Sequence, residues 1–363
     1  MNVDEINKYS FSLHDHKNHE LDIALLSLKI GIMAYLSTYS KVHRFFDFIA
    51  EKEEDIQYVR KRLRESGYIQ DYVETIFHFF LFIEISVKEI LRNKHELLVS
   101  LGGNHHEILY KLLFQEENVS PDEIENLQSI SFADAQQRLI KLIKKGKFEN
   151  SKDMKIIIEK GKKDKGLDTL RIIRNRLIHR GTLVLDYRGL DKVIGEDLLP
   201  ITIELLNLPI YKHHEFRWQP KDLHCKIDPL KEIINECKTS EPNIRKIAIY
   251  KQLALAAYAN PIEAPMSALP FKGPTIKEEA EERAKKERDD WSDRPVDKEI
   301  KICPVCGAKA LVRYMETRGE YNTLSYVDAI HCFCCDLYLD SDNLQDASIS
   351  INGLNAKRFW QIS

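Results

Sequence analysis

The sequence DTLRIIRNRLIHRG, from Asp168 to Gly181, combines the clearest helical pattern of the chain with its most chemically suggestive side chains. Its apolar residues recur at the i, i+3, i+7, i+8 spacing of one helix face, namely Leu170, Ile173, Leu177 and Ile178. Asp168 is expected to cap the start, and Gly181 fits the left-handed conformation that ends many helices. The stretch therefore predicts a helix with a buried apolar face and a basic outer face.

Three polar residues of this helix are candidates for chemistry: Arg174, Asn175 and His179. His179 falls in the last turn, where the negative end of the helix dipole favours a protonated imidazole. Arg174 lies five residues earlier, roughly 140° around an ideal helix, so the two side chains are expected to straddle the edge of the apolar stripe. We expect that two copies packed helix to helix could enclose a phosphate, whereas one copy could hardly do so.

Arg-Asn-x-x-x-His on a late helix resembles the R-x(4-6)-H motif of the HEPN superfamily, over roughly residues 20–205. The resemblance implies an all-α bundle and a metal-independent endoribonuclease site formed across a homodimer. Arg174 and His179 would then be the catalytic pair, with Asn175 positioning one of them. The resemblance also implies RNA as substrate and a role as a toxin or in antiviral defence. Position 181 is glycine, whereas some HEPN toxins carry a tyrosine there.

The charge distribution agrees with a polyanionic partner. Residues 138–180 contain 15 Lys and Arg against 5 Asp and Glu, a balance of +10, which leaves −13 for the rest of a chain whose net charge is −3. Such a segment can steer an RNA backbone toward the helix, with substrate contacts expected from Arg171, Arg176 and Arg180. The alternative is a solvated basic surface, with His179 interacting with the helix end.

The length of 363 residues and a hydrophobic content of 43% predict a globular protein of two or three parts. The first 22 residues carry acids and histidines where a secretory signal needs an apolar core, so we expect a cytoplasmic protein. The apolar runs Ile23–Tyr39 and Ile76–Ile85 are interrupted by charges and are expected to be buried helices, with no membrane partner. Glu84, in the second run, is expected to form a structural salt bridge or to approach Arg174.

We predict a mainly α fold: a HEPN-like helical domain over 1–260, with its core at about 20–205 and a helical extension over 206–260. After Gly181, TLVLDYRGL is expected to be a short extended segment or a loop. Residues 261–300 are predicted to be a linker, in which Lys277 to Asp293 is either an exposed helix or a spacer. Residues 301–363 are predicted to form a separate β module.

That module contains two Cys-x-x-Cys pairs, separated by 25 residues, with Gly307 directly after the first pair; the cysteines are Cys303, Cys306, Cys332 and Cys335. Four thiolates presented by two tight turns suit tetrahedral zinc. The intervening ALVRYMETRGEYNTLSYVDAIH predicts two strands around Arg318-Gly319, so the module resembles a zinc ribbon. A closed four-thiolate site is structural and leaves no position for a catalytic water.

Other metal and redox assignments remain open. Cys334 or His331 could replace a predicted zinc ligand, and His213, His214, His224 and Cys225 form a weaker zinc alternative. Disulfides fit a cytoplasmic chain poorly, and a thioredoxin-type motif would need a βαβ context. The sequence has no P-loop, no carboxylate cluster for two-metal catalysis and no serine-hydrolase elbow.

Two functions are therefore expected from the sequence. The first is metal-independent cleavage of RNA through the 2′-hydroxyl, giving a 2′,3′-cyclic phosphate, with zinc only structural and no catalytic cofactor. The second is a non-catalytic HEPN-like module that binds RNA, nucleotide or protein. In either case the ribbon is expected to bind nucleic acid or a protein partner, such as an activator.

Overall fold

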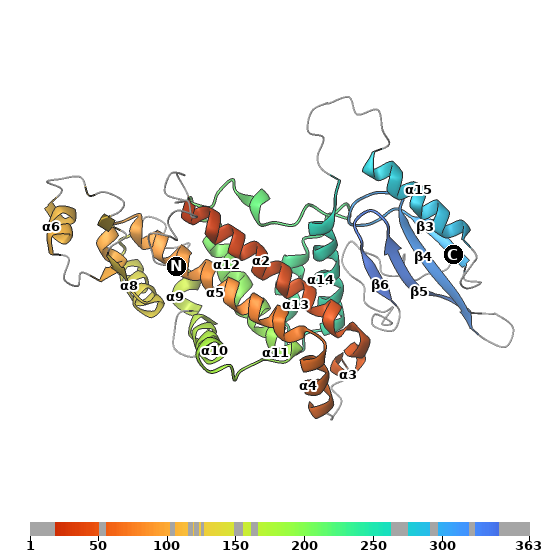
Figure 1. The fold of residues 1–363 in the computed structure, drawn as a ribbon, viewed down its shortest axis with the longest axis horizontal. Coiled ribbons are helices and arrows are strands. Elements are labelled where there is room, and N and C mark those ends of the chain that lie inside the picture. The colour runs from red at the N-terminus through yellow and green to blue at the C-terminus, as the bar shows by residue number, and fades with distance from the viewer. Residues whose placement is uncertain are drawn as a thin grey trace, which may run out of the picture. The chain divides into compact units, whose positions relative to one another are not determined.

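The computed structural model describes residues 19–50, 56–101, 106–114, 119, 123–124, 127–148, 155–160, 166–262, 275–290, 297–318 and 324–340. The protein is mainly helical, with a small antiparallel sheet near the C-terminus (Figure 1). This confirms the predicted fold class at that level. The chain divides into two compact units: residues 1–31, 76–179 and 200–218 form unit 1, and residues 32–75, 180–199 and 219–363 form unit 2.

The helical elements follow one another along the chain, together with two short strands that pair antiparallel to each other. They are α2 (His19–Val42), η2 (His43–Phe45), α3 (Phe46–Ala50), α4 (Ile56–Glu65), α5 (Tyr68–Arg92), η3 (Glu96–Leu98), β1 (Ser100–Leu101), α6 (His106–Phe114), β2 (Gln128–Ser129), α8 (Phe132–Lys144), α9 (Lys155–Lys160), α10 (Gly166–Arg180), α11 (Tyr187–Lys192), a π-helical turn η4 (Val193–Leu198), α12 (Leu199–Leu206), η5 (Glu215–Arg217), α13 (Pro229–Cys237) and α14 (Ile244–Ala259). Residues 182–186, the TLVLD of TLVLDYRGL, lack regular structure, and the YRGL that follows is the start of α11.

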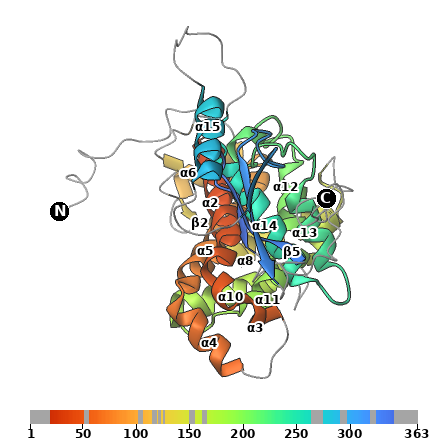
Figure 2. The ribbon, with the colours of Figure 1, turned by 90° about the vertical axis from the view of Figure 1, so that its right-hand side faces the viewer.

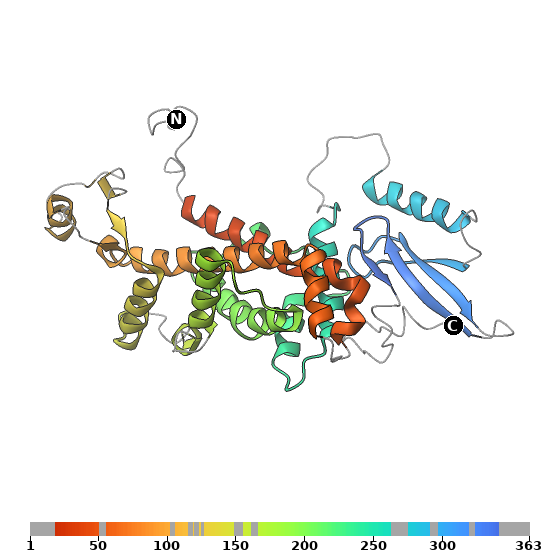
Figure 3. The same ribbon diagram turned by 60° about the horizontal axis from the view of Figure 1, so that its bottom comes forward.

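Unit 1 is built around the apolar central part of α5. Phe79 and Phe82 are fully buried there, and Gly31 of α2 comes so close that an added Cβ would lie 3.2 Å from the Phe79 backbone nitrogen. Helices α8 and α10 lie on the same side of α5 (Figures 1 and 3). Glu84 of α5 forms an ion pair with Lys88 at 2.8 Å, which confirms the structural salt bridge.

A stretch of α2 and the residues after it needs separate mention. Among the described residues, Ile23–Ile49 is long and apolar enough, by length and composition, to cross a membrane, and 61% of its most apolar window is buried inside the structure. Core helices of soluble proteins pass the same test, so this is weak evidence for a membrane span. The predicted apolar run Ile23–Tyr39 lies within α2, which extends to Val42.

In unit 2, a buried ion pair joins three helices. The Lys251 ammonium lies 2.6 Å from an Asp191 carboxylate oxygen, and both side chains are almost completely buried. The ammonium also donates to the Thr38 hydroxyl at 3.0 Å and lies 4.2 Å and 4.1 Å from the ring centres of Tyr35 and Tyr187. Burial lowers the pKa of Lys251 and raises the pKa of Asp191. Charges are stable there only because they compensate each other.

Helices α13 and α14 pack side by side in the same unit (Figures 1 and 2). The π-helical turn lies against α13 at Gly195, where an added Cβ would come within 2.3 Å of the Cys237 sulfur. The Cys237 thiol donates to the Asp191 carbonyl at 3.5 Å. Only a glycine permits this approach, so the π-helical turn and α13 are matched in shape.

The sheet module contains four antiparallel strands in the order β3 (Asp297–Lys301), β4 (Leu311–Arg318), β5 (Leu324–Cys332) and β6 (Tyr338–Asp340). Strands β4 and β5 confirm the two predicted strands on either side of Arg318-Gly319, with Leu311 opposite Cys332. Helix α15 (Ile276–Asp289) lies along this sheet (Figures 1 and 3). Ala280 and Ala284 face inward, and Glu287 pairs with Lys298 at 2.8 Å.

The segment predicted as a linker, 261–300, therefore contains a helix that belongs to the sheet module, together with most of β3. The helix is held at its start by a capping box between Thr275 and Glu278. Charged residues occupy the whole surface of this helix except for a narrow stripe of alanines. Alanines are a weak apolar signal in a sequence. Of the two alternatives for Lys277 to Asp293, the helix is the one observed over most of the segment.

The buried pair yields a stability prediction. Lys251→Met should lower the free energy of unfolding by about 3–5 kcal/mol, because it leaves the Asp191 carboxylate buried without a partner. The double variant Lys251→Met with Asp191→Leu should recover most of this loss. Lys231→Met is the matched control: its ammonium pairs with Asp228 at 3.1 Å on the surface and should contribute less than about 1 kcal/mol. Urea unfolding measures all three variants; equal losses in the two single variants would contradict the prediction.

Candidate functional site

The two Cys-x-x-Cys pairs form turns with the same backbone hydrogen bonds. In the first, the Cys303 amide donates to the Ala308 carbonyl at 2.9 Å, and the Gly307 amide donates to the Cys303 carbonyl at 3.0 Å. In the second, Cys332 bonds in the same way to Leu337 and Asp336, at 2.9 Å and 3.0 Å. The fifth residue of each turn has positive φ: Gly307 at 74° and Asp336 at 58°. Each turn therefore presents its two sulfurs on one side.

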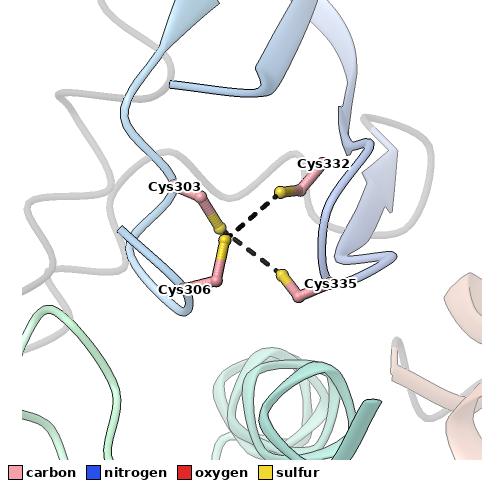
Figure 4. Close-up of side chains that lie close together, drawn as sticks. All are labelled: Cys303, Cys306, Cys332 and Cys335. Atoms are coloured by element: carbon pink, nitrogen blue, oxygen red, sulfur yellow. Dashed lines mark hydrogen bonds between the residues drawn. The ribbon is translucent and has the colours of Figure 1, made fainter. Parts of the chain in front are cut away.

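Figure 4 shows the four sulfurs converging from these two turns. The Cys303 and Cys335 sulfurs are 3.6 Å apart, those of Cys306 and Cys332 are 3.7 Å apart, and all four lie within 4.8 Å of one another. Four sulfurs placed tetrahedrally at about 2.3 Å from a zinc ion would be about 3.8 Å apart. The four predicted ligands are thus close enough to hold a metal ion, and their spacing is compatible with zinc.

The thiols also constrain the charge that the cluster can carry. Hydrogen bonds from the other three thiols lower the pKa of Cys306, whereas the corresponding bonds raise the pKa of Cys303. The hydrogen bond with Cys303 lowers the pKa of Cys332 as well, so ionisation of Cys306 and Cys332 is favoured and that of Cys303 is opposed. A divalent cation in the centre would reverse this, because it favours all four thiolates.

The alternative ligands do not belong to this four-sulfur group. Among the described residues, the group whose ligand atoms lie close enough together to hold a metal ion consists of these four cysteines. The imidazole of His331 pairs with Asp336 at 2.9 Å. Burial raises the pKa of Cys334 to about 12. His224 and Cys225 contact the first turn through their backbones instead: their amides donate to the Val305 and Pro304 carbonyls, each at 2.9 Å. Apart from their residue types, nothing in the sequence indicated that His224 and Cys225 lie next to this turn.

The predicted catalytic helix is α10, and its start and its buried face differ from the sequence-based expectation. It begins at Gly166, so Asp168 lies inside the first turn and accepts two hydrogen bonds from Arg171, at 3.2 Å and 2.5 Å, instead of capping the start. Leu167, Leu170 and Ile173 are buried, but Ile178 is 44% exposed. The apolar face of α10 is therefore buried in the first part of the helix but exposed at Ile178, near its C-terminal end. Gly181 has φ 60°, as predicted for the helix end.

The three predicted catalytic residues lie together at this end of α10. Arg174 donates from Nη1 to the Asn175 side-chain oxygen at 3.0 Å, and the same nitrogen lies 3.4 Å from His179 Nε2. The two side chains therefore meet within one copy, although the helical angle predicted that they would only straddle the stripe. The long arginine side chain spans the gap.

An aromatic pair holds the guanidinium of Arg174. Its Cζ lies 4.8 Å from the ring centre of Phe80 in α5, and Phe80 in turn packs edge-on against Phe132 of α8 at 5.1 Å. The buried Nε of Arg174 has no hydrogen-bond partner among the described residues. A guanidinium fixed over a ring keeps its charge and loses little freedom when it binds an anion. The sequence had no signal for Phe80 in this role.

The remaining basic residues divide into engaged and exposed groups. Arg171 is bound to Asp168, whereas Arg176 and Arg180 are exposed on α10. Lys141, Lys144, Lys145 and Lys147 are exposed at the end of α8 and just beyond it, also in unit 1. Residues 149–154 and the basic stretch 161–165 lie outside the described residues. The described part of unit 1 thus places exposed cations both at the end of α8 and around the Arg174 and His179 side chains.

No protein-family model, no curated protein and no solved structure matches this chain.

The first cysteine turn yields a second prediction. Gly307→Ala should destabilise the turn by about 1–2 kcal/mol, because an L-residue is strained at this φ; its Cβ would also meet the His224 ring at 2.8 Å. The variant should release its bound metal faster to a chelator. Asp336→Gly is the matched control at the equivalent position and should retain the metal. Metal release followed with a chromophoric chelator tests this; equal release rates would contradict it.

Proposed function

We propose that the protein is a metal-independent endoribonuclease of the HEPN type, active as a homodimer, in which Arg174 and His179 are the catalytic pair. The observation that carries this proposal is the cluster at the end of α10, where Arg174 Nη1 contacts both Asn175 and His179 while its guanidinium lies over Phe80. The cluster combines a permanent cation with a group that can exchange protons near neutral pH.

The chemistry follows from these groups. In the free protein, Arg174 Nη1 lies 3.4 Å from His179 Nε2, and it can donate to that nitrogen when the imidazole carries its only proton on Nδ1. A phosphate of RNA competes for the arginine through charge-assisted hydrogen bonds and thereby releases Nε2. That nitrogen removes the proton of the 2′-hydroxyl, and the 2′-oxygen attacks phosphorus while the P–O5′ bond breaks. The second copy's histidine protonates the leaving 5′-oxygen, and the products are a 2′,3′-cyclic phosphate and a 5′-hydroxyl.

Zinc is proposed as the metal of the four cysteines, with a structural role. The donor set of four sulfurs is closed, so it has no position for a catalytic water. The ribbon is proposed to bind nucleic acid or a protein partner such as an activator, and the whole protein is proposed to be a cytoplasmic toxin or defence factor. The second candidate function is binding of RNA without cleavage, which the exposed cations of α8 and α10 also favour.

The decisive experiment is incubation of mixed RNA with the full chain in EDTA, with the zinc content measured alongside so that loss of the ribbon is recognised. His179→Ala should lower the cleavage rate by about 100-fold or more, because it removes the proton acceptor, and should leave most of the RNA affinity. His106→Ala, at an exposed histidine of α6, is the matched control. Cleavage by both variants at the wild-type rate, or fragment ends without cyclic phosphate, would disprove the proposal. RNA binding without cleavage supports the second candidate.

Phe80 is proposed as a positioning residue for Arg174. Phe80→Leu should lower kcat by about 3- to 30-fold, the equivalent of losing a cation–π contact, with little change in KM. Phe77→Leu, on the same helix but 40% exposed, is the matched control. Restoration of kcat by Phe80→Tyr, which keeps the ring, separates positioning from a general loss of stability. If kcat follows only the thermal midpoint of the variants, Phe80 has no role beyond packing.

A further inference from the structure

A cleft of about 490 Å³ opens in unit 2, away from the cysteines and from α10 in sequence. Its walls are the last turn of α2 with η2 on one side and α4 on the other. The volume is in the range of about 300–1,000 Å³ that is usual for small-molecule sites. The cleft lies within the stretch 32–75, which forms part of a single compact unit, so its two walls belong together.

The described walls of the cleft carry an excess of positive charge. Lys41, Arg44 and Arg62 are permanent cations, and Glu65 is the one carboxylate that lines the cleft. Glu65 lies 3.6 Å from Arg62, so these two partly compensate each other. Among the described residues, neither Lys41 nor Arg44 has a carboxylate within ion-pair distance, and both are exposed. The positive charge of Lys41 also acts on Asp71, which does not line the cleft. The side chains that line the cleft still carry three permanent cations against one carboxylate.

Arg62 is held in place by an aromatic residue of the same helix. Its Nε donates to the Tyr58 hydroxyl at 3.1 Å, and its guanidinium lies 5.2 Å from the centre of that ring. The hydrogen bond with Tyr58 also raises the pKa of Arg62. An arginine fixed in this way loses little freedom when an anion binds, and this preorganisation increases affinity.

The hydroxyl groups of the cleft are already engaged. Ser40 donates to the Ser37 carbonyl at 2.6 Å, and Ser66 donates to the Leu63 carbonyl at 3.3 Å. Neutral donors on the walls thus contribute little to the recognition of a ligand. The cations dominate, and they suit an anion that carries at least two charges close together.

We propose that this cleft binds a small ligand with a diphosphate or triphosphate group, held by Lys41, Arg44 and Arg62. Nucleoside polyphosphates and inorganic polyphosphates share this chemistry. In the first case the Tyr58 side chain supplies the wall beside the organic part. A long nucleic acid strand is a poorer fit, because it requires a groove that follows several phosphates along the surface.

Titration calorimetry of the full chain at low salt, without magnesium, tests the site with three probes: pyrophosphate, ATP and adenosine. Pyrophosphate and ATP should bind, with affinities that fall as NaCl is added, and adenosine should not. ATP binding more tightly than pyrophosphate identifies a nucleotide as the better ligand, and equal affinities identify the phosphate group alone. If neither anion releases or absorbs heat at millimolar concentration, the proposal is overturned. The cations would then only stabilise the C-terminal ends of their helices, through the helix dipole.

Two variants give opposite expected effects. Arg44→Gln should weaken pyrophosphate binding by about tenfold or more, because it removes a charge-assisted hydrogen bond. Glu65→Gln should tighten binding, because it removes the carboxylate that competes for Arg62; misfolding cannot produce this gain. Arg60→Gln is the matched control, an exposed arginine of α4 that does not line the cleft. Equal weakening by Arg44→Gln and Arg60→Gln would exclude the site. His179→Ala should bind normally, so this result is independent of the ribonuclease proposal.

Discussion

The helical core of unit 2 depends on one buried ammonium. Lys251 satisfies its charge only if Asp191, Thr38 and two tyrosine rings surround it at the observed distances. These groups come from α2, α11 and α14, which are widely separated along the chain. A hydrophobic contact would tolerate a small shift of one helix, whereas an ion pair in a low-dielectric interior does not. The pair therefore limits how far these three helices can shift against one another.

The cysteine module could be predicted from the sequence because its constraints are local. Two thiols at i and i+3 require a tight turn, and Gly307 occupies the position with positive φ. The second turn has Asp336 at that position, which is less conspicuous in a sequence although aspartate tolerates this conformation. Helix α15 was harder to recognise, because only two alanines mark its buried side. The position of such a highly charged helix depends mainly on the module against which it packs, so the sequence of the helix alone indicates it only weakly.

Helix α10 shows which features a sequence pattern can predict and which it cannot. Its apolar residues and Gly181 predicted the helix and its termination, but the periodic stripe included Ile178, which the structure leaves 44% exposed. Periodicity describes the helix alone, and burial depends on how far the neighbouring helices extend. The contact between Arg174 and His179 was missed for a similar reason, because angles around a helix ignore the reach of a long side chain. Phe80 lies 94 positions before Arg174, a separation at which sequence patterns carry no contact information.

The hydrogen bonds from His224 and Cys225 to the first cysteine turn have a consequence for the order in which the protein can be completed during synthesis. The acceptor carbonyls belong to Pro304 and Val305, about 80 residues later in the chain. That turn reaches its final geometry only when Cys332 and Cys335 have also been made and the four sulfurs can share an ion. The amides at 224–225 must therefore wait for these acceptors until the second cysteine turn has also been synthesised, and a chain that stops before Cys332 would present those amides to whatever acceptor it meets.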